Sequence, residues 1–471
     1  VAPMLFRSSL ALTMLSQIGY LIIICLSYNM LLGQGGMLSF GHAVYTGLGS
    51  FIAIHAMNMA TKGSAGIPLV LIPLVGGLAG AFFAILLGFV TTKKSGTTFA
   101  MITLGVGELV AAMALMFPEF FGGEGGITTD RVYGTPFFGI TFGPAIQVYY
   151  LIAAYCFVCT AAMFAFTGTP LGRILNAVRD NPERVEFIGY NTQRVRYFAF
   201  IIAGFFAGIG GGLATINFEI ITGADSLSVL RSGGYLLFTF LGGATFFFGP
   251  IIGAVLLVLA SVLLSELSKA WLLYLGLVFL FMVMYAPGGI ASLIMMNLRL
   301  AKYGKLRPLW VSYLGLAGTG LVGVLGAACM VEMTYHLQLN AAVGPEMNFL
   351  GATINAKSLT SWFGAGFVLL TGGGLFELCR RQFARQWSYI QEEFGNEIKR
   401  GEAMEAWRLI TQPTRWNCAT CARVLARQKS SAAPIWPWLL ASGWPSLAPM
   451  ARASPRCSTS SAGASHPPAA T

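Results

Sequence analysis

Long apolar segments separated by short polar breaks repeat along most of the 471 residues of this chain. Only 10% of the residues are charged and 56% are hydrophobic, whereas an ordinary soluble domain carries roughly 25% charged residues. So few charges cannot cover a soluble surface. An apolar stretch of about 20 residues can cross a bilayer as a helix, because a helix satisfies its own backbone hydrogen bonds. The pattern therefore predicts a membrane protein.

The spacing of the apolar runs predicts an all-α, polytopic transmembrane helical bundle with about nine core spans and about two extra C-terminal spans. The expected core spans are 9–31, 38–58, 66–91, 97–117, 146–167, 196–217, 230–248, 249–265 and 270–286, and the extra spans are 312–334 and 359–379.

The formal net charge of +11 is concentrated in the polar breaks. Lys and Arg are retained on the cytoplasmic side of membrane spans, so this placement favours a multi-pass protein of the bacterial inner membrane over a nucleic-acid-binding protein. If the basic break 168–195 is cytoplasmic, Lys93, Lys94 and the segment 299–307 are cytoplasmic too, and the loop 118–145 lies outside. The same count puts Val1 outside, which leads us to expect a missing upstream span.

A helix break is expected between the first two spans, where Gly35, Gly36 and Gly41 surround Ser39 and His42. Broken helices at membrane depth usually line a cavity. Ser39, Gly41 and His42 are therefore candidate translocation-pathway residues, although a histidine here can equally be a buried residue with satisfied hydrogen bonds.

Glu108 is an ionisable residue inside an expected span, and such residues are functional candidates by default. Gly105 and Gly107 leave room beside the same helix. Two roles stay open for Glu108: hydrogen bonding to a neighbouring helix, or contact with a transported substrate.

The segment 172–189 is charged and amphipathic and lies between two apolar spans. Its Asp180, Asn181 and Pro182 predict that one helix stops and another starts, because Asn or Asp caps a helix and Pro fits its first turn. A short pair of interfacial helices is expected.

Residues 10–295 resemble the membrane subunits of branched-chain amino-acid ABC importers, a family that includes urea and amide permeases. The resemblance rests on six stretches in the family's order: 26–42, 97–108, 172–181, 241–244, 248–250 and 285–289. It implies that 172–189 is a cytoplasmic loop that docks on an ATPase subunit and transmits its closure. The residues carried over for this role are Gly172, Ala177, Arg179, Asp180, Asn181 and Gly189.

The resemblance also implies the partners: a homologous second permease, two ATP-binding subunits, a periplasmic or extracellular substrate-binding protein, and membrane lipid. Branched-chain amino acids lead as substrates, with urea, short amides and other amino acids open. No phosphate-binding motif occurs in the printed frame, so we expect this chain to bind no cofactor and a partner to use the ATP.

Two other functional classes would leave different marks in the sequence. An ion-gradient-driven secondary transporter of small polar solutes should carry intramembrane carboxylates in several spans, and a membrane enzyme should cluster His, Asp and Glu at one membrane face. Neither pattern is present in this sequence.

The cysteines predict neither a metal site nor disulfides. Cys418 and Cys421 lack the second ligand pair that a zinc site needs. The other cysteines lie in or beside apolar segments, where a free thiol behaves as a small hydrophobic group: Cys25, Cys156, Cys159, Cys329 and Cys379.

Three regions are therefore expected: a permease domain at 1–295, an extension at 296–404, and a tail at 405–471. From Trp416 to Thr471 there is no Asp or Glu. Reading Leu447 to Ser458 in the shifted frame, with allowed codons, gives Gly-Pro-Asn-Gly-Ala-Gly-Lys-Ser-Thr-Leu-Phe, which is a phosphate-binding loop. We interpret the tail from about residue 416 as a frameshifted, disordered remnant of a fused ATPase domain.

Overall fold

The computed structural model describes residues 9–62, 67–132, 141–268, 270–286, 288–302, 307–339, 346–349 and 352–411. Within these residues the regular secondary structure is helical apart from two short antiparallel strand pairs, β1 with β2 and β3 with β4. This confirms the predicted all-α helical bundle. One unit comprises Val1–Ile390 and a second comprises Gln391–Thr471. The expected frameshifted tail lies outside the described residues.

The elements follow one another in this order: α2 (Ser9–Asn29), η1 (Met30–Gln34), α3 (His42–Thr61), η2 (Leu69–Leu71), α4 (Ile72–Thr91), α5 (Thr97–Met116), α6 (Pro118–Phe121), β1 (Ile127–Thr128), α7 (Ala145–Gly168), α8 (Pro170–Asp180), α9 (Pro182–Phe187), α10 (Thr192–Phe218), β2 (Ile220–Ile221), α11 (Gly223–Ser226), α12 (Val229–Gly242), α13 (Gly249–Leu259), η3 (Ala260–Leu264), α14 (Ser265–Leu267), α15 (Trp271–Tyr285), α16 (Gly289–Lys302), α17 (Arg307–Leu339), β3 (Glu346–Phe349), β4 (Ala352–Asn355) and α18 (Leu359–Thr411).

Seven helices in the described part of the chain are long and apolar enough to cross a membrane, or up to eight if the bent pair α15–α16 is one span. This is fewer than the eleven apolar runs in the sequence. The run at 38–58 does form a helix, α3, but α3 is not among these seven, and its buried residues include polar His42, Thr46 and Ser50. The bundle around it shields these groups.

The two adjacent runs at 230–248 and 249–265 differ from the expected pair of spans. The first forms α12, whose 14 residues would reach only about 21 Å at the helical rise of about 1.5 Å per residue. The second forms α13 and the π-helical η3. A Cβ on Gly249 would lie 1.9 Å from the Gly243 carbonyl oxygen, so this close glycine contact makes a tight helical hairpin instead of two full spans.

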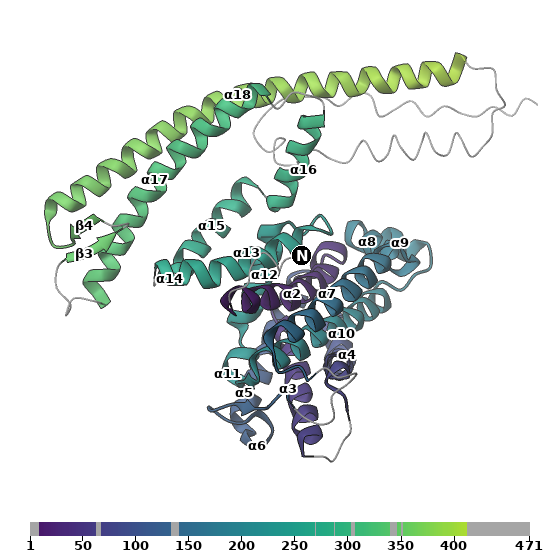
Figure 1. Ribbon diagram of the computed structural model, residues 1–471. Coiled ribbons are helices and arrows are strands. Elements are labelled where there is room, and N and C mark those ends of the chain that lie inside the picture. The colour runs from purple at the N-terminus through teal and green to yellow at the C-terminus, as the bar shows by residue number, and fades with distance from the viewer. Residues whose placement is uncertain are drawn as a thin grey trace, which may run out of the picture. The chain divides into compact units, whose positions relative to one another are not determined.

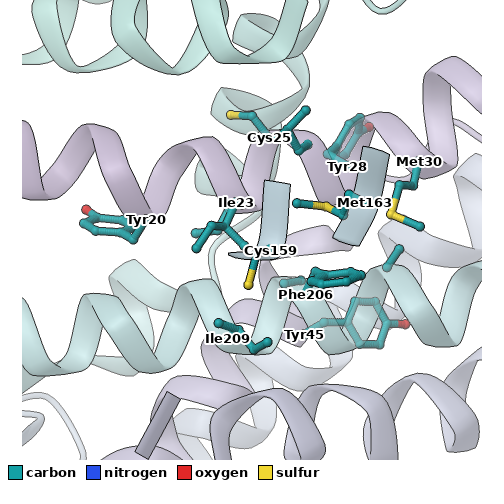
Figure 2. Packing of buried hydrophobic residues seen from close by; sticks show 14 of the residues in the cluster. Tyr20, Ile23, Cys25, Tyr28, Met30, Tyr45, Cys159, Met163, Phe206 and Ile209 are labelled. Carbon is teal, nitrogen blue, oxygen red and sulfur yellow. The ribbon is translucent and has the colours of Figure 1, made fainter. Parts of the chain in front are cut away.

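The core is organised around α10, which contacts α2, α3 and α4. Gly208 is a point of very close packing against α4, because a Cβ there would lie 2.2 Å from the Gly76 carbonyl oxygen. Small residues allow membrane helices to approach this closely. On the α2 side of α10, Figure 2 shows large apolar side chains, among them Tyr28, Met163 and Phe206, filling the space between the helices.

The helix ends support the predicted orientation. The Tyr197 hydroxyl near the start of α10 donates to the Ile85 carbonyl near the end of α4, so α4 and α10 are antiparallel and the Lys93–Lys94 turn lies at the end that carries α8 and α9. At the other end of α10, β2 pairs with β1 from the loop 118–145. The break at 299–307 is only partly described, so its side stays a prediction.

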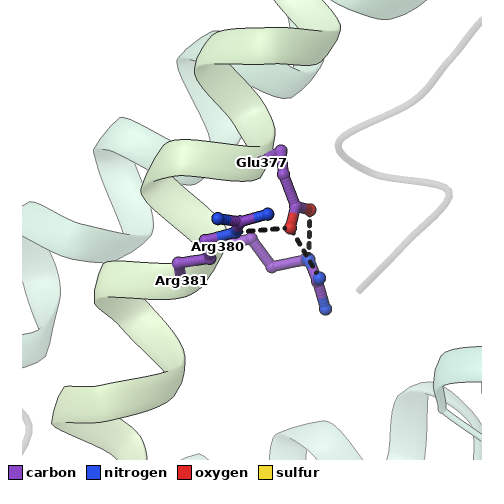
Figure 3. Close-up of polar contacts among 3 residues, drawn as sticks. All are labelled: Glu377, Arg380 and Arg381. Carbon is purple, nitrogen blue, oxygen red and sulfur yellow. Dashed lines mark hydrogen bonds and ion pairs between the residues drawn. The ribbon is translucent and has the colours of Figure 1, made fainter.

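The extension forms a helical hairpin, in which α17 and α18 run side by side (Figure 1). A Cβ on Gly372 would lie 2.4 Å from the Gly323 amide nitrogen, so glycines again permit the close approach. The Glu332 carboxylate of α17 accepts hydrogen bonds from the Ser268 and Tyr274 hydroxyls. On α18, Glu377 pairs with Arg380 and Arg381 one turn later (Figure 3), which partly neutralises the start of the charged segment.

Candidate functional site

The helices α8 and α9 form the interfacial pair that the sequence predicts. Thr169 caps α8 by accepting a hydrogen bond from the Gly172 amide, and Asn181 caps α9 by accepting one from the Arg184 amide. Pro182 occupies the first turn of α9. The stop and restart at Asp180–Pro182 is therefore a local consequence of capping and proline chemistry.

Gly172 and Gly189 are needed for the shape of this segment. A Cβ on Gly172 would lie 2.3 Å from the Phe166 carbonyl oxygen, where α7 turns into α8. Gly189 has φ +94°, a conformation that favours glycine after a helix end.

The two helices also expose several side chains. Ala177 and Asp180 are exposed, as are the large apolar side chains of Phe187 and Ile188, at 89% and 75%. The pair thus presents an uncovered surface.

Arg179 ties this segment to the helix break at 35–41. Its Nη1 donates to the Gly33 carbonyl oxygen, while Nε and Nη2 donate to Asp180 Oδ1 at 3.0 and 2.9 Å. A Cβ on Gly36, whose φ is +64°, would meet the Arg179 side chain at 2.8 Å. Within this chain Arg179 thus contacts the end of the helical run that α2 begins, and its role toward a partner protein stays a prediction.

The break itself is present. The helical run of α2 and η1 ends at Gln34, and α3 begins at His42. His42 is fully buried; its Nε2 lies 2.9 Å from Ser27 Oγ, and its ring packs edge-on against Tyr28. The Tyr28 hydroxyl donates to the Ser39 carbonyl at 2.7 Å.

Two other helices, α5 and α12, contact the break. The Phe40 amide donates to Thr103 Oγ1 of α5 at 3.1 Å, and the Ala43 amide donates to Ser232 Oγ of α12 at 2.9 Å. The α carbon of Gly41 lies 3.7 Å from the Cβ position of Gly107. The structure therefore brings Ser39, Gly41, His42 and Gly107 together.

Four buried polar atoms around the break have no hydrogen-bond partner among the described residues: Asn29 Oδ1, Gln34 Oε1, Ser39 Oγ and His42 Nδ1. An unsatisfied buried polar atom costs about 1–3 kcal/mol. Water or a polar solute in this region would remove that cost, as expected if Ser39 and His42 line a pathway.

Gly105 and Glu108 are not part of this group. A Cβ on Gly105 would have no neighbour within 4 Å, and Glu108 is exposed on the outer face of α5. No hydrogen bond or ion pair of Glu108 is seen within the described part of the chain. Both roles left open for Glu108, hydrogen bonding to a neighbouring helix and contact with a substrate, stay predictions.

One group of residues that forms a cavity has no signal in the sequence. A cavity of about 270 Å³ lies among α2, α3, α10, β2, α11 and α12. Its lining includes the ion pair Asp225–Arg231, with Arg231 Nη2 2.5 Å from Asp225 Oδ2. The cavity combines residues of the segment 211–235 with residues of α2 and α3, which are distant in sequence, so no local motif marks it.

Metal chemistry finds no support in the described residues, where no cluster of three or more His, Cys, Asp or Glu side chains could hold an ion. The five described cysteines, Cys25, Cys156, Cys159, Cys329 and Cys379, are free thiols. Cys418 and Cys421 lie outside the described residues.

Comparison with known proteins gives a consistent result. Residues 10–287 match the family model described as branched-chain amino acid transport system / permease component. The chain is 28% identical over 301 residues to the high-affinity branched-chain amino acid transport system permease protein LivM of Escherichia coli strain K12, covering 59% of this chain and 69% of that protein. The LivM of Salmonella typhimurium is 27% identical over the same shares. No solved structure matches the chain.

Proposed function

Because the chain belongs to the branched-chain amino acid transport system permease family, we propose that it is the membrane subunit of an ATP-driven importer of branched-chain or related small amino acids. It works beside a homologous second permease, two ATP-binding subunits that hydrolyse the ATP, and a periplasmic or extracellular substrate-binding protein. It resides in the bacterial inner membrane. This chain binds no cofactor in this scheme.

The observation that carries the proposal is the link between the α8–α9 pair and the helix break. Arg179 bonds to Gly33 across 146 residues of sequence, and Leu175 of α8 packs on Gly35. A partner that moved α8 would therefore move the backbone at 33–36. The contact gives ATPase closure a direct route to the bundle. An importer requires such a route, and a solvated loop without contacts to the bundle would not provide one.

The exposed surface of the pair suits a protein partner. Phe187 and Ile188 are large apolar side chains that this chain leaves uncovered, and they stand beside the charged residues Glu183 and Arg184. An apolar centre with a charged rim is typical of protein interfaces. We assign this surface to the ATP-binding subunit.

A second permease would cover the outer face of α5. Glu108 is exposed there among apolar residues such as Met101 and Leu109. A carboxylate facing lipid at the centre of a span costs about 2.5–3.5 kcal/mol on the insertion scale. A neighbouring subunit, or an aqueous pathway between the two subunits, would relieve this cost.

The test is ATP-driven uptake by the assembled complex in proteoliposomes. Arg179→Ala should lower uptake by about tenfold or more, because a hydrogen bond to a charged group contributes about 1.5–3 kcal/mol. The ATP-binding subunits should still co-purify with the variant. Arg173→Ala is the matched control, since Arg173 is an exposed arginine of the same helix.

Equal losses in the two variants would mean that α8 acts through general charge, and the link through Gly33 would be wrong. Normal uptake by Arg179→Ala and Asp180→Ala together would remove the coupling role of this segment.

A further inference from the structure

The cavity of about 270 Å³ lies at the end of the bundle opposite α8 and α9. Phe218, at the end of α10, and Ile220 and Ile221 of β2 form part of its wall. Since α8 and α9 precede the start of α10, the cavity lies toward the opposite end of this helix from them. In the predicted orientation this is the side on which a solute enters.

One wall of the cavity carries both signs of charge. The Asp225–Arg231 pair is partly open to solvent, with 64% and 33% of the two side chains exposed. An arginine has five N–H donors in a planar fork, and such a fork matches a carboxylate with two parallel hydrogen bonds. Arg231 also contacts the buried Tyr235, which fixes the fork at the cavity wall.

A second wall carries three hydroxyl groups that donate to backbone carbonyls of their own helices and keep acceptor lone pairs, and Thr46 also contacts the Tyr235 side chain. Thr46 donates its proton to the Ala43 carbonyl, Ser50 to the Thr46 carbonyl, and Thr215 to the Gly211 carbonyl. A hydroxyl has one donor and two acceptor lone pairs. All three side chains are buried and line the cavity, so their remaining lone pairs suit an ammonium group.

A third part of the lining is apolar, with Ile24, Phe218, Ile220 and Ile221 as its largest members, and Thr222 and Ser226 add two more hydroxyl groups beside Asp225. Cavities for drug-sized ligands are roughly 300–1,000 Å³, so this one fits a smaller molecule. The ligand it matches has a carboxylate, an ammonium group and a short apolar side chain, and carries no net charge.

We propose that this cavity is a binding site for the zwitterion of a small aliphatic amino acid on its way into the bundle; the inference rests on the proposed importer function and deepens it. The ligand carboxylate takes the Arg231 fork, its ammonium group lies between Asp225 and the oxygens of Thr46, Ser50 and Thr215, and its side chain contacts the apolar wall. Binding thus exchanges the Asp225–Arg231 pair for two ligand pairs.

The test uses the complete complex in proteoliposomes, with radiolabelled L-leucine and ATP. Arg231→Gln and Asp225→Asn should each lower uptake by at least about tenfold, the effect of about 1.4 kcal/mol. Arg131→Gln is the control, because Arg131 pairs with Glu219 near the same end of the bundle but does not line the cavity.

A double variant, Asp225→Arg with Arg231→Asp, separates ligand binding from a structural ion pair. If the pair only holds α11 to α12, the exchanged charges should restore uptake, and the proposal would be overturned. If Arg231 binds the ligand carboxylate, uptake should stay at least tenfold below wild type. In the double variant the new aspartate would face the carboxylate and the new arginine would face the ammonium group.

Thr215→Val keeps the proposal testable if the charge variants do not fold. It removes one acceptor oxygen at nearly constant volume and should lower uptake several-fold. Thr239→Val is its control, because Thr239 is equally buried but lies outside the cavity lining. Equal uptake by Thr215→Val and wild type would contradict the site. Absence of ATP-driven uptake in the wild-type complex would instead contradict the proposed function.

Discussion

Replacing Gly208 by Ala should destabilise the bundle by a calculable amount. The added Cβ would lie 2.2 Å from the Gly76 carbonyl oxygen and 3.0 Å from the Gly80 α carbon. Both neighbours are backbone atoms, so α4 and α10 must separate by about 1 Å to restore an ordinary contact near 3.5 Å. Inserting one carbon into a packed core costs typically 1–3 kcal/mol.

The control is Gly105→Ala, at a helical glycine with no atom within 4 Å of the added Cβ. Both substitutions gain the same helix propensity of about 1 kcal/mol, so the difference between them isolates the packing cost. In thermal unfolding of the purified chain in detergent, Gly208→Ala should melt several degrees below Gly105→Ala, since about 1 kcal/mol corresponds to roughly 2–4 °C.

Equal melting temperatures for the two alanine variants would refute the reasoning. They would mean that α4 and α10 do not approach at Gly76 and Gly208, and that the glycines of α10 are not packing positions.

Three further outcomes are expected. Ser27→Ala removes the hydroxyl that contacts His42 Nε2 at 2.9 Å and should lower the free energy of unfolding by about 1 kcal/mol, measured by thermal melting; no change would mean that this contact is not formed. Glu332→Leu removes the acceptor for Ser268 and Tyr274 and should speed amide hydrogen exchange at residues 268–274. Unchanged exchange would mean that Glu332 does not stabilise this segment. Resequencing the codons for Pro413 to Trp416 should find one missing or extra base followed by an open frame through the phosphate-binding loop; an unaltered frame would end the frameshift interpretation.

Features set by neighbouring residues were predictable from the sequence. The helix stop and restart at Asp180–Pro182 depends on one cap and one proline. The break between Gln34 and His42 follows from its glycines. The polar breaks also marked the ends of α4, α7 and α10, because charged residues cannot remain in the hydrocarbon core.

Features set by distant contacts were not predictable. Nothing local to Arg179 points to Gly33, and nothing local to Arg231 points to Thr215 on another helix. The hairpin α12–α13 was read as two full spans, because an apolar run has the same composition whether it crosses a membrane or folds back inside a bundle. Glu108 was recognisable as unusual, but its outward direction depends on how α5 packs.

The most direct test of the account is uptake by this chain in proteoliposomes under two energy sources. With its second permease, ATP-binding subunits and binding protein present, branched-chain amino acids should accumulate against their gradient only when ATP is supplied. The purified chain alone, given a proton or sodium gradient and no ATPase, should accumulate none. Uphill uptake by the chain alone would contradict the importer account and identify an ion-gradient-driven transporter.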